Sequence, residues 1–450
     1  MDELVQLGGT EPGSREAAGT ADCPVSNFSA QDKPTWELYS TCIHCGLCLN
    51  HCPTYRVLGT EMDSPRGRIY QVLQVDEGNL PIGDSFVTHI DRCLGCLACE
   101  TACPSGVQYG HIVERARAQI ETHYRRPWME RTLRKFFFTR ALRDFQLLSN
   151  LGKGLRFYQQ SGLQKLVRAS GVLHLLGLAK LERLTPEMDP VFFFSNLGML
   201  IPAEGELRAR VGFHAGCISN MAFAGLNHAT VRLLARNGVE VHIVKRQRCC
   251  GALQAHAGFR EDARLLARRN IDAFAKEMHL LDAIVTNAAG CGSNLKDYPD
   301  LLKDDPAYAG KAVAFSAKVK DVTEYLAEVG LREPLRKLAG KVAFQDPCHL
   351  HHAQKIFRAP RELLMAAGAT LVELPHPEQC CGSAGTYNVT QNELSMKILD
   401  AKLDDVDAAG EFDVLATANV GCMLQLKAGL EQRGKNIPVR HVVEMLEECY

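Results

Sequence analysis

The chain has 450 residues, which is too long for a single hydrophobic core and favours about three domains. Apolar residues make up 46% of the sequence and charged residues 23%, a balance that excludes global disorder. The formal net charge of −1 argues against a dedicated nucleic-acid-binding protein, because neutralising phosphates requires a basic excess. We therefore expect several folded domains and no nucleic-acid partner.

The N-terminus shows neither an export signal nor a membrane span. It has no basic segment followed by an apolar one, and no stretch reaches the roughly 18 consecutive apolar residues of a spanning helix. We expect a cytoplasmic protein, with peripheral association on the inner face of the cytoplasmic membrane as an alternative. The 18 cysteines then indicate metal or redox chemistry, because the cytosol keeps thiols reduced.

The first third of the chain changes character at residue 36. Residues 1–35 are rich in Gly, Ser, Ala and acidic side chains without an apolar period, and predict a mobile tail. Residues 36–124 hold two cysteine-rich phrases, "TCIHCGLCLNHCPTY" and "RCLGCLACETACPSG", together with short helical patterns. We expect this segment to be a compact, mostly helical domain.

Each phrase places four cysteines in the spacing C-x2-C-x2-C-x3-C-P. This spacing is typical of [4Fe-4S] clusters, where three thiolates of a tight loop bind one cluster and the fourth cysteine serves the other. The expected ligands are Cys42, Cys45, Cys48 and Cys103 for one cluster, and Cys93, Cys96, Cys99 and Cys52 for the second. A pair of four-cysteine zinc sites is the alternative, although such sites usually show separated CxxC pairs.

The residues beside these cysteines fit electron transfer. Gly46, Gly95 and Ala98 are small enough to let backbone N–H groups approach the sulfurs. His44 and His51 are expected to be partly exposed side chains and not ligands, because the cysteines already complete both sets. Two adjacent clusters suit the passage of single electrons between a donor and an acceptor, and this passage needs no acid–base pair.

Residues 125–206 form a basic segment. Its first part, residues 125–190, has 13 Lys or Arg against 5 Asp or Glu, although the whole chain is nearly neutral. Apolar residues recur at helical spacing in "RTLRKFFFTRALRDFQLLSNLGKGLRFYQQ", which predicts amphipathic helices. We expect a helical connector with solvated basic faces; docking on an acidic partner or on anionic lipid is the alternative.

From residue 207 onward, short β-branched runs alternate with helical patterns. This alternation predicts βαβ units with parallel sheets. The expected strands lie in "RVGFHAG", "VEVHIVK", "DAIVTNAAG", "KVAFQDP", "ATLVELP" and "DVLATANVG".

The cysteines of this half reveal a tandem duplication. Four of them recur with a constant offset of 131 positions: Cys217, Cys249, Cys250 and Cys291 correspond to Cys348, Cys380, Cys381 and Cys422. Four matches in register indicate two copies of one α/β unit. We name them, after the Cys-Cys-Gly that each contains, CCG unit 1 (residues 207–337) and CCG unit 2 (residues 338–450).

The CCG cysteines follow predicted strands, so their thiols are expected to converge at the carboxyl ends of the sheets, where sites form. Three interpretations are open: a further iron-sulfur cluster in one or both units, a thiol/disulfide or substrate-contacting site without metal, or buried cysteines of a once-functional repeat. In CCG unit 2, His349, His351 and His352 could carry protons for a quinone or another acceptor, although a solvated loop is the simpler interpretation. Cys23 and Cys449 lie outside these patterns.

The two phrases, "DSPRGRIYQ" at residues 63–71 and the two CCG units together resemble the iron-sulfur subunits of glycolate oxidase over residues 36–450. Similar chains occur in lactate-utilisation complexes, anaerobic glycerol-3-phosphate dehydrogenase and heterodisulfide reductase. The resemblance implies two [4Fe-4S] clusters on the eight cysteines of the phrases. It also implies a separate flavoprotein subunit that holds FAD and oxidises glycolate to glyoxylate, with electrons relayed to the membrane quinone pool. In heterodisulfide reductase each CCG unit ends in CxxC, whereas Ala288 and Asn419 replace the first cysteine here, which removes one ligand per unit.

We therefore expect a multidomain α plus α/β protein that is the electron-transfer subunit of a flavin-dependent glycolate dehydrogenase. No G-x-G-x-x-G follows a predicted strand, so we expect neither a flavin or nicotinamide site nor a catalytic residue in this chain. The alternatives are a thiol/disulfide reductase acting through the CCG units, the equivalent subunit of a lactate or glycerol-3-phosphate dehydrogenase, and a scaffold with structural metal.

Overall fold

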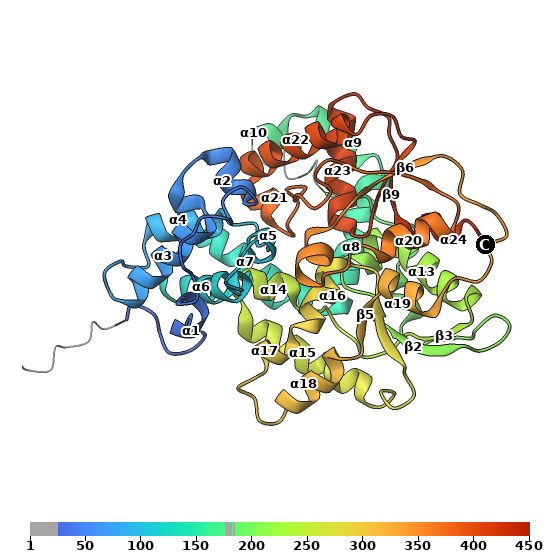
Figure 1. Ribbon diagram of the computed structural model, residues 1–450, viewed down its shortest axis with the longest axis horizontal. Coiled ribbons are helices and arrows are strands. Elements are labelled where there is room, and N and C mark those ends of the chain that lie inside the picture. Colours follow the sequence, from blue (N-terminus) through green and yellow to red (C-terminus); the bar gives the residue numbers. More distant parts are fainter. Residues whose placement is uncertain (1–25, 176–181, 183–184) are drawn as a thin grey trace, which may run out of the picture.

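The computed structural model describes residues 26–175, 182 and 185–450 and combines a helical N-terminal part with two α/β units (Figure 1). The helical part, blue in Figure 1, lies at one side of the two units, which are green to red. The expected fold class is confirmed. Of the tail expected over residues 1–35, residues 1–25, with Cys23, lie outside the described residues.

The helical domain that carries the two cysteine phrases is built from short helices around one apolar core. Its elements are α1 (Trp36–Tyr39), α2 (Pro53–Leu58), η1 (Glu61–Asp63), α3 (Pro65–Asp76), α4 (Asp84–Asp91), α5 (Ala98–Thr101) and α6 (Tyr109–His123). The core is formed by apolar side chains at helical spacing on α3, α4 and α6, such as Val72, Phe86 and Ile112.

Residues 26–35 pack against this domain, although their composition predicted a tail. Phe28 is buried in the core, with its ring 6.3 Å from that of Phe86. The backbone of Asn27 donates to Val75 O at 3.1 Å, and the backbone of Ser29 donates to Gln119 Oε1 at 2.9 Å. One buried aromatic side chain and backbone hydrogen bonds hold this segment in place. Its average composition does not reveal these contacts.

The basic connector is helical, as expected, and much of it is packed. It contains α7 (Trp128–Thr139), η2 (Ala141–Arg143), α8 (Phe145–Gln160), α9 (Leu163–Ala169), α10 (Val172–Leu175) and η3 (Phe193–Asn196). Phe138, Phe145 and Phe193 join the core of CCG unit 1. Part of the positive charge is neutralised, since Arg126 pairs with Asp91 at 2.7 Å.

CCG unit 1 has a five-stranded sheet in the order β1-β3-β2-β4-β5. The strands are β1 (Leu200–Ile201), β2 (Ala209–Phe213), β3 (Val239–His242), β4 (Ala283–Thr286) and β5 (Val319–Asp321). Strands β2 to β5 are parallel, as predicted, whereas β1 comes from the connector and pairs antiparallel with β3. The sheet therefore begins before residue 207.

CCG unit 2 repeats this topology in a four-stranded parallel sheet of order β7-β6-β8-β9. Its strands are β6 (Lys341–Gln345), β7 (Thr370–Val372), β8 (Val414–Thr417) and β9 (Val439–His441). When β2 and β6 are counted as the first strands of their units, both parallel sheets have the order second, first, third, fourth. The duplication therefore extends to the fold. The final strands β5 and β9 were not predicted, because each has three residues with a charged one in the middle.

The two units exchange helix contacts in a reciprocal way. Helix α13 (Ala224–Arg236), the long helix after the first strand of unit 1, packs against α24 (Val442–Glu447), the last helix of unit 2. Likewise α20 (Ala359–Ala366) packs against α19 (Val322–Val329), the last helix of unit 1. This arrangement indicates a pseudo-two-fold relation, which turns the cysteine-bearing ends of both sheets toward each other.

The remaining helices cover the sheets and carry the connecting loops. They are α12 (Ser219–Ala222), α14 (Ala252–His256), α15 (Arg260–Ala275), α16 (Ala289–Lys296), α17 (Tyr298–Leu301), α18 (Ala309–Ser316), the π-helix η4 (His349–Ala353), α21 (Tyr387–Thr390), α22 (Asn392–Ala408) and α23 (Val420–Gln432). No helix among residues 26–175, 182 and 185–450 is long and apolar enough to cross a bilayer.

An ion-pair network fastens α6 of the helical domain to CCG unit 1. Arg115 pairs with Asp300 at 2.8 Å, and His111 Nε2 lies 3.0 Å from Asp297 Oδ1. Arg260, almost fully buried, pairs with Asp300 from the other side. Although burial disfavours the charged imidazole, the hydrogen bond to Asp297 and the surrounding carboxylates raise the pKa of His111 to about 9.

Replacing His111 with Gln should lower the thermal midpoint in a pH-dependent way. Because the folded-state pKa of His111 is raised, its stabilisation is complete below the unfolded pKa of about 6.5 and is lost as pH rises through about 9. The midpoint difference between wild type and H111Q is therefore expected to be large at pH 6 and small at pH 10. H123Q, which changes an exposed histidine at the end of α6, is the matched control. A difference that stays constant with pH would contradict the role of this ion pair.

Candidate iron-sulfur sites

The loops of the two phrases are conformational copies of each other. His44 and Gly46 in the first loop have φ of 53° and 85°, and Gly95 and Leu97 in the second have 67° and 64°. In each loop, one of these left-handed residues directly precedes the second cysteine and the other directly follows it. These turns fold each loop tightly, so that its sulfurs face one point.

The fourth cysteine of each phrase lies beside the other loop. Cys52, at the N-cap of α2, lines a small cavity of about 20 Å³ together with Cys93, Cys96 and Cys99. We call these four the second cage. Cys42, Cys48 and Cys103 pack against the same apolar core of the helical domain. We call Cys42, Cys45, Cys48 and Cys103, the other expected set, the first cage.

In the second cage, two groups donate hydrogen bonds to the Cys93 sulfur, whereas burial raises the pKa of the Cys52 and Cys99 thiols. Gly95 N donates to Cys93 Sγ at 3.3 Å, and Tyr109 Oη at 3.5 Å. Burial raises the pKa of the Cys93 thiol, but Arg68, Arg117 and these hydrogen bonds lower it overall. Because the thiolate is the metal ligand, this donor set and its polar surroundings fit a [4Fe-4S] cluster.

Arg68 is the main residue that sequence reasoning missed. It is fully buried and donates to His89 O at 2.7 Å and to Thr54 Oγ1 at 3.1 Å. Its partner Asp63 is also fully buried, with a separation of 3.5 Å. Arg68 lies on the buried face of α3, one turn before Val72, and a charged residue at such a position is the signal that could have identified it.

The rest of "DSPRGRIYQ" fixes the start of α3 beside the first cage. Ser64 caps the helix by accepting from Gly67 N at 3.0 Å. A Cβ on Gly67 would lie 2.0 Å from Glu61 O, so only glycine fits there. Arg66 donates to His44 O at 3.0 Å, and its backbone N–H donates to the sulfur of Cys48. The motif thereby positions the helix N-terminus against the first loop.

The thiols of each CCG unit also converge. In CCG unit 1, Cys249 Sγ lies 3.3 Å from Cys217 Sγ, and the neighbouring thiols of Cys249 and Cys291 lower the pKa of Cys250. In CCG unit 2 the corresponding neighbours are Cys348 and Cys380, Cys380 and Cys381, and Cys381 and Cys422. The glycine after each pair has a positive φ, 92° at Gly251 and 86° at Gly382.

The electrostatics of the two CCG units match at the second cysteine of each vicinal pair. Hydrogen bonds from the neighbouring thiols lower the pKa of Cys250 and of Cys381, the second cysteine of each pair. Buried Lys402, with Nζ 2.8 Å from Asp405 Oδ2, further lowers the pKa of Cys381. In CCG unit 2 the neighbouring Cys380 thiol and His349 also lower the pKa of Cys348 to about 5. Each unit therefore holds at least one favoured thiolate, which suits either metal binding or thiol chemistry.

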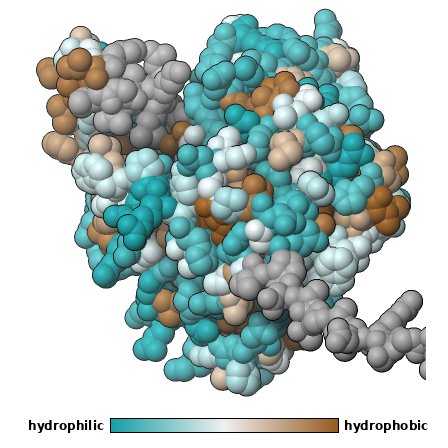
Figure 2. Space-filling model, turned by 90° about the vertical axis from the view of Figure 1, so that its left-hand side faces the viewer, coloured by the Kyte–Doolittle hydropathy of each residue, from teal (hydrophilic) through white to brown (hydrophobic). Residues whose placement is uncertain are grey.

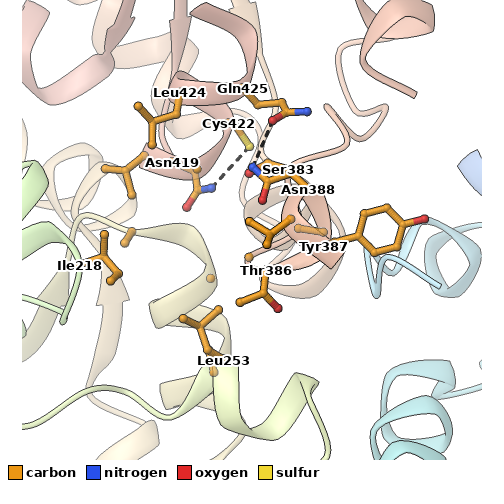
Figure 3. Close-up of a pocket in the computed structure, with 18 of the residues that line it drawn as sticks. Ile218, Leu253, Ser383, Thr386, Tyr387, Asn388, Asn419, Cys422, Leu424 and Gln425 are labelled. Carbon is orange, nitrogen blue, oxygen red and sulfur yellow. Dashed lines mark hydrogen bonds between the residues drawn. The ribbon is translucent and has the colours of Figure 1, made fainter. Parts of the chain in front are cut away.

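All eight CCG cysteines line one large cavity between the two units, with a volume of about 1300 Å³. We call it the inter-repeat cavity. CCG unit 2 supplies amide and hydroxyl groups, from Ser383, Thr386, Asn388, Asn419 and Gln425, together with apolar side chains such as Leu424 (Figure 3). CCG unit 1 supplies apolar side chains, among them Ile218 and Leu253 (Figure 3).

Asn419 occupies the position where a CxxC motif would have its first cysteine. Its Nδ2 donates to Cys422 Sγ at 3.4 Å (Figure 3). Ala288 takes the corresponding place in CCG unit 1 and also lines the cavity. The missing ligand is thus replaced by a hydrogen bond to sulfur in one unit and by an apolar side chain in the other.

The second cage lies directly against CCG unit 2. Leu94, Cys96 and Ala98 pack with Cys348 and Cys380 in one buried cluster. Cys93 and Leu94 also line the inter-repeat cavity. The buried end of the helical domain therefore contacts the cysteines of the α/β units without intervening solvent.

The first cage lies at the surface. Cys45 is exposed, and its neighbours Ile43 and Leu47 have 68% and 59% of their surface exposed. The face of the helical domain shown in Figure 2 is otherwise mostly hydrophilic, with small separate hydrophobic patches. The two cages thus differ in access, with one exposed and one enclosed.

The histidines of interest lie in different environments. His44 and His51 are exposed, as expected. The segment with His349, His351 and His352 forms the π-helix η4 and not a solvated loop. His349 Nδ1 lies 3.4 Å from Cys348 Sγ at the cavity wall, His351 pairs with Asp346 at 3.0 Å, and His352 is buried with Nδ1 3.0 Å from Thr101 Oγ1. Cys449 is buried and donates to Met445 O at 3.4 Å.

Comparison with known proteins agrees with this arrangement. Residues 39–107 match the 4Fe-4S dicluster domain, residues 211–296 and 342–427 match the cysteine-rich CCG domain, and residues 129–185 match the linker region of the glycolate oxidase iron-sulfur subunit. The chain is 39% identical to the probable glycolate oxidase iron-sulfur subunit of Bacillus subtilis (strain 168), over 91% of this chain and 93% of that protein. It is 37% identical to the glycolate oxidase iron-sulfur subunit of Escherichia coli (strain K12), over 92% and 94%.

The chain belongs to the family of glycolate oxidase iron-sulfur subunits. It is an iron-sulfur electron-transfer subunit, and the dicluster match favours iron over the zinc alternative. Lactate utilization protein A of Geobacillus sp. (strain WCH70) is 30% identical over 53% of this chain and 98% of that protein. Nearly all of this shorter relative therefore matches about half of the present chain.

Replacing Tyr109 with Phe should lower the reduction potential at the second cage. The variant removes an O–H donor to Cys93 Sγ that favours the more negative reduced state. A lost hydrogen bond of about 1 kcal/mol corresponds to roughly 40 mV for one electron. An EPR-monitored redox titration measures the shift. Y124F, which removes an exposed O–H bonded to Asp84 just after α6, is the matched control, and equal shifts in both variants would contradict the assignment.

Proposed function

We propose that this chain relays single electrons from a flavoprotein subunit, which oxidises glycolate to glyoxylate, to a membrane quinone. The observation that carries the proposal is the order of the sites: an exposed first cage, an enclosed second cage, and the inter-repeat cavity in contact with the second cage. A bound [4Fe-4S] cluster accepts and donates one electron at a time. The chain supplies the ligands, the spacing and the exclusion of water along this route.

The proposed ligands follow the cages. Two [4Fe-4S] clusters are bound, one by Cys42, Cys45, Cys48 and Cys103, and the other by Cys93, Cys96, Cys99 and Cys52. The small cavity that Cys52 shares with Cys93, Cys96 and Cys99 supports this crossed ligation. Arg68 and Arg117 compensate the negative charge of the second set, and Arg66 orders the first loop.

The two ends of the route suit different partners. The exposed loop with Cys45, Ile43 and Leu47 suits a docked flavoprotein that holds FAD, because electron-transfer contacts are typically small. The inter-repeat cavity has room for a quinone headgroup, with amide and hydroxyl groups from CCG unit 2 and apolar side chains from both units. Reduction of a quinone to a quinol takes two electrons and two protons; the protons come from water, since the cavity reaches the surface at exposed Val389.

The location follows from the partners. We propose a cytoplasmic protein that is peripheral on the inner face of the membrane, with no nucleic-acid partner. As an alternative, the chain is the equivalent electron-transfer subunit of a dehydrogenase for another 2-hydroxy acid or for glycerol-3-phosphate. The substrate binds the flavoprotein and not this chain, so the same relay serves either reaction.

A thiol/disulfide reductase is the second candidate function. It is supported by the vicinal pairs Cys249–Cys250 and Cys380–Cys381, which line a cavity large enough for a small disulfide. Loss of disulfide-reducing activity in C250S or C381S, with both [4Fe-4S] signals intact, would favour it over the relay.

Crossed ligation can be tested in a background that retains one cluster. Replacing Cys42, Cys45 and Cys48 together with Ala should leave only the cluster of the second cage. In this background C52S should change the EPR spectrum of the remaining cluster, whereas C103S should leave it unchanged. If C103S alters the spectrum and C52S does not, each phrase binds its own cluster and the crossed arrangement is wrong.

We propose that the CCG thiols bind at least one further iron-sulfur cluster. Protein purified without oxygen should then contain about twelve irons or more per chain, with matching sulfide, and not the eight of two clusters. Replacing Cys217 and Cys348 together with Ser should lower the count toward about eight while preserving the EPR signals of the two cages. A wild-type count of about eight would favour a metal-free thiol site. The isolated chain should not oxidise glycolate with a dye acceptor, and turnover without a partner would contradict the proposed division of labour.

A further inference from the structure

Helix α7 presents an apolar face to solvent. Four of its large apolar side chains are strongly exposed: Trp128 by 71%, Met129 by 57%, Leu133 by 62% and Phe136 by 45%. Their spacing of one, four and three residues places them on one side of the helix. Single exposed apolar residues are ordinary, whereas four on one helix face indicate a contact surface.

The opposite face of α7 is firmly packed, so the apolar face cannot turn inward. The buried Phe138 ring stacks on that of Phe259, with centroids 5.0 Å apart. Arg134 pairs with Glu121 at 2.6 Å. The orientation of the helix is therefore set by the protein itself and not by a partner.

Unpaired cations border the apolar face. Arg125, Arg131, Lys135 and Arg140 are exposed, and none of them forms a side-chain hydrogen bond or ion pair within the described part of the chain. The one acidic residue of the helix, Glu130, is bound to Arg126 at 3.3 Å. The surface around Trp128 thus combines apolar side chains with a net positive charge.

We propose that α7 seats the protein on the surface of an anionic membrane, with its apolar side chains in the headgroup region and its cations against lipid phosphates. Exposed Trp, Leu and Phe beside Arg and Lys are the composition of helices that lie in a membrane interface. The unneutralised positive charge is complementary to anionic lipid, to which each cation contributes attraction. The inference goes beyond the proposed relay, because it assigns the membrane contact to one helix.

Helix α7, the proposed membrane contact, also borders the inter-repeat cavity. Its inner side chains Glu130, Arg134 and Phe137, together with Arg126, line the inter-repeat cavity. Seating the outer face in the headgroups therefore brings one side of the cavity to the membrane surface. A lipid-soluble acceptor can then reach the cavity without crossing bulk water.

The test uses the full-length, cluster-loaded protein and vesicles of phosphatidylcholine with or without phosphatidylglycerol. Wild type should co-sediment with the anionic vesicles and much less with the neutral ones. The triple variant W128S/L133S/F136S should lose binding by at least about tenfold, and R131Q/K135Q should lose about fivefold for each cation removed. V313S, which changes a side chain 58% exposed on α18, should bind as wild type does.

Iron content and EPR signals, unchanged in every variant, show that the protein is folded. The proposal is overturned if wild type does not bind anionic vesicles, if neutral vesicles bind equally well, or if the triple variant binds as wild type does. Loss of flavoprotein co-purification by the triple variant, with vesicle binding retained, would assign the face to a protein partner instead. Reduction of the clusters by glycolate and the flavoprotein is measured separately in solution. That measurement tests the electron relay, whereas vesicle binding tests the membrane contact of α7.

Discussion

The contact between the second phrase loop and CCG unit 2 is the interaction on which the arrangement depends. Leu94, Cys96 and Ala98 are buried against Cys348 and Cys380, so two sets of cysteines from distant parts of the chain share one apolar cluster. Such a contact excludes water between the sites and holds their separation constant, because a packed interior has few voids. The ion pairs of α6 with CCG unit 1 and the hydrogen bond from Tyr387 to Arg92 O then fix the helical domain on both units.

The duplication serves the site as well as the fold. Reciprocal packing of α13 on α24 and of α20 on α19 turns the two sheets so that their carboxyl ends face each other. One unit alone would offer a shallow group of thiols, whereas two units enclose a cavity with thiols on both sides. The copies have diverged where they face the cavity: Asn419 hydrogen-bonds to Cys422, while Ala288 is apolar. The cavity therefore has two unlike walls, which can orient an unsymmetrical ligand.

Patterns along the sequence predicted the features that are encoded by residue spacing. The cysteine spacing, the offset of 131 residues and the β-branched runs indicated the cages, the repeat and six of the strands. Strands β5 and β9 were missed because three residues with a central charge carry no period. The packing of Phe28 and the contact of Cys96 with Cys380 depend on residues far apart in the sequence, and no pattern along the chain reports them. The position of Arg68 on the apolar side of α3, by contrast, is a signal in the sequence that was missed. The exposure of the apolar face of α7 likewise required knowing which side of the helix is packed.

The central claim is that electrons enter at the exposed first cage and reach the second cage through it. The most direct measurement is the EPR signal of the second cage after glycolate is added to the complex of the flavoprotein with the C42A/C45A/C48A variant. The account predicts that glycolate no longer produces this signal, although dithionite still does. A glycolate-dependent signal of normal size and rate in that variant would contradict the account.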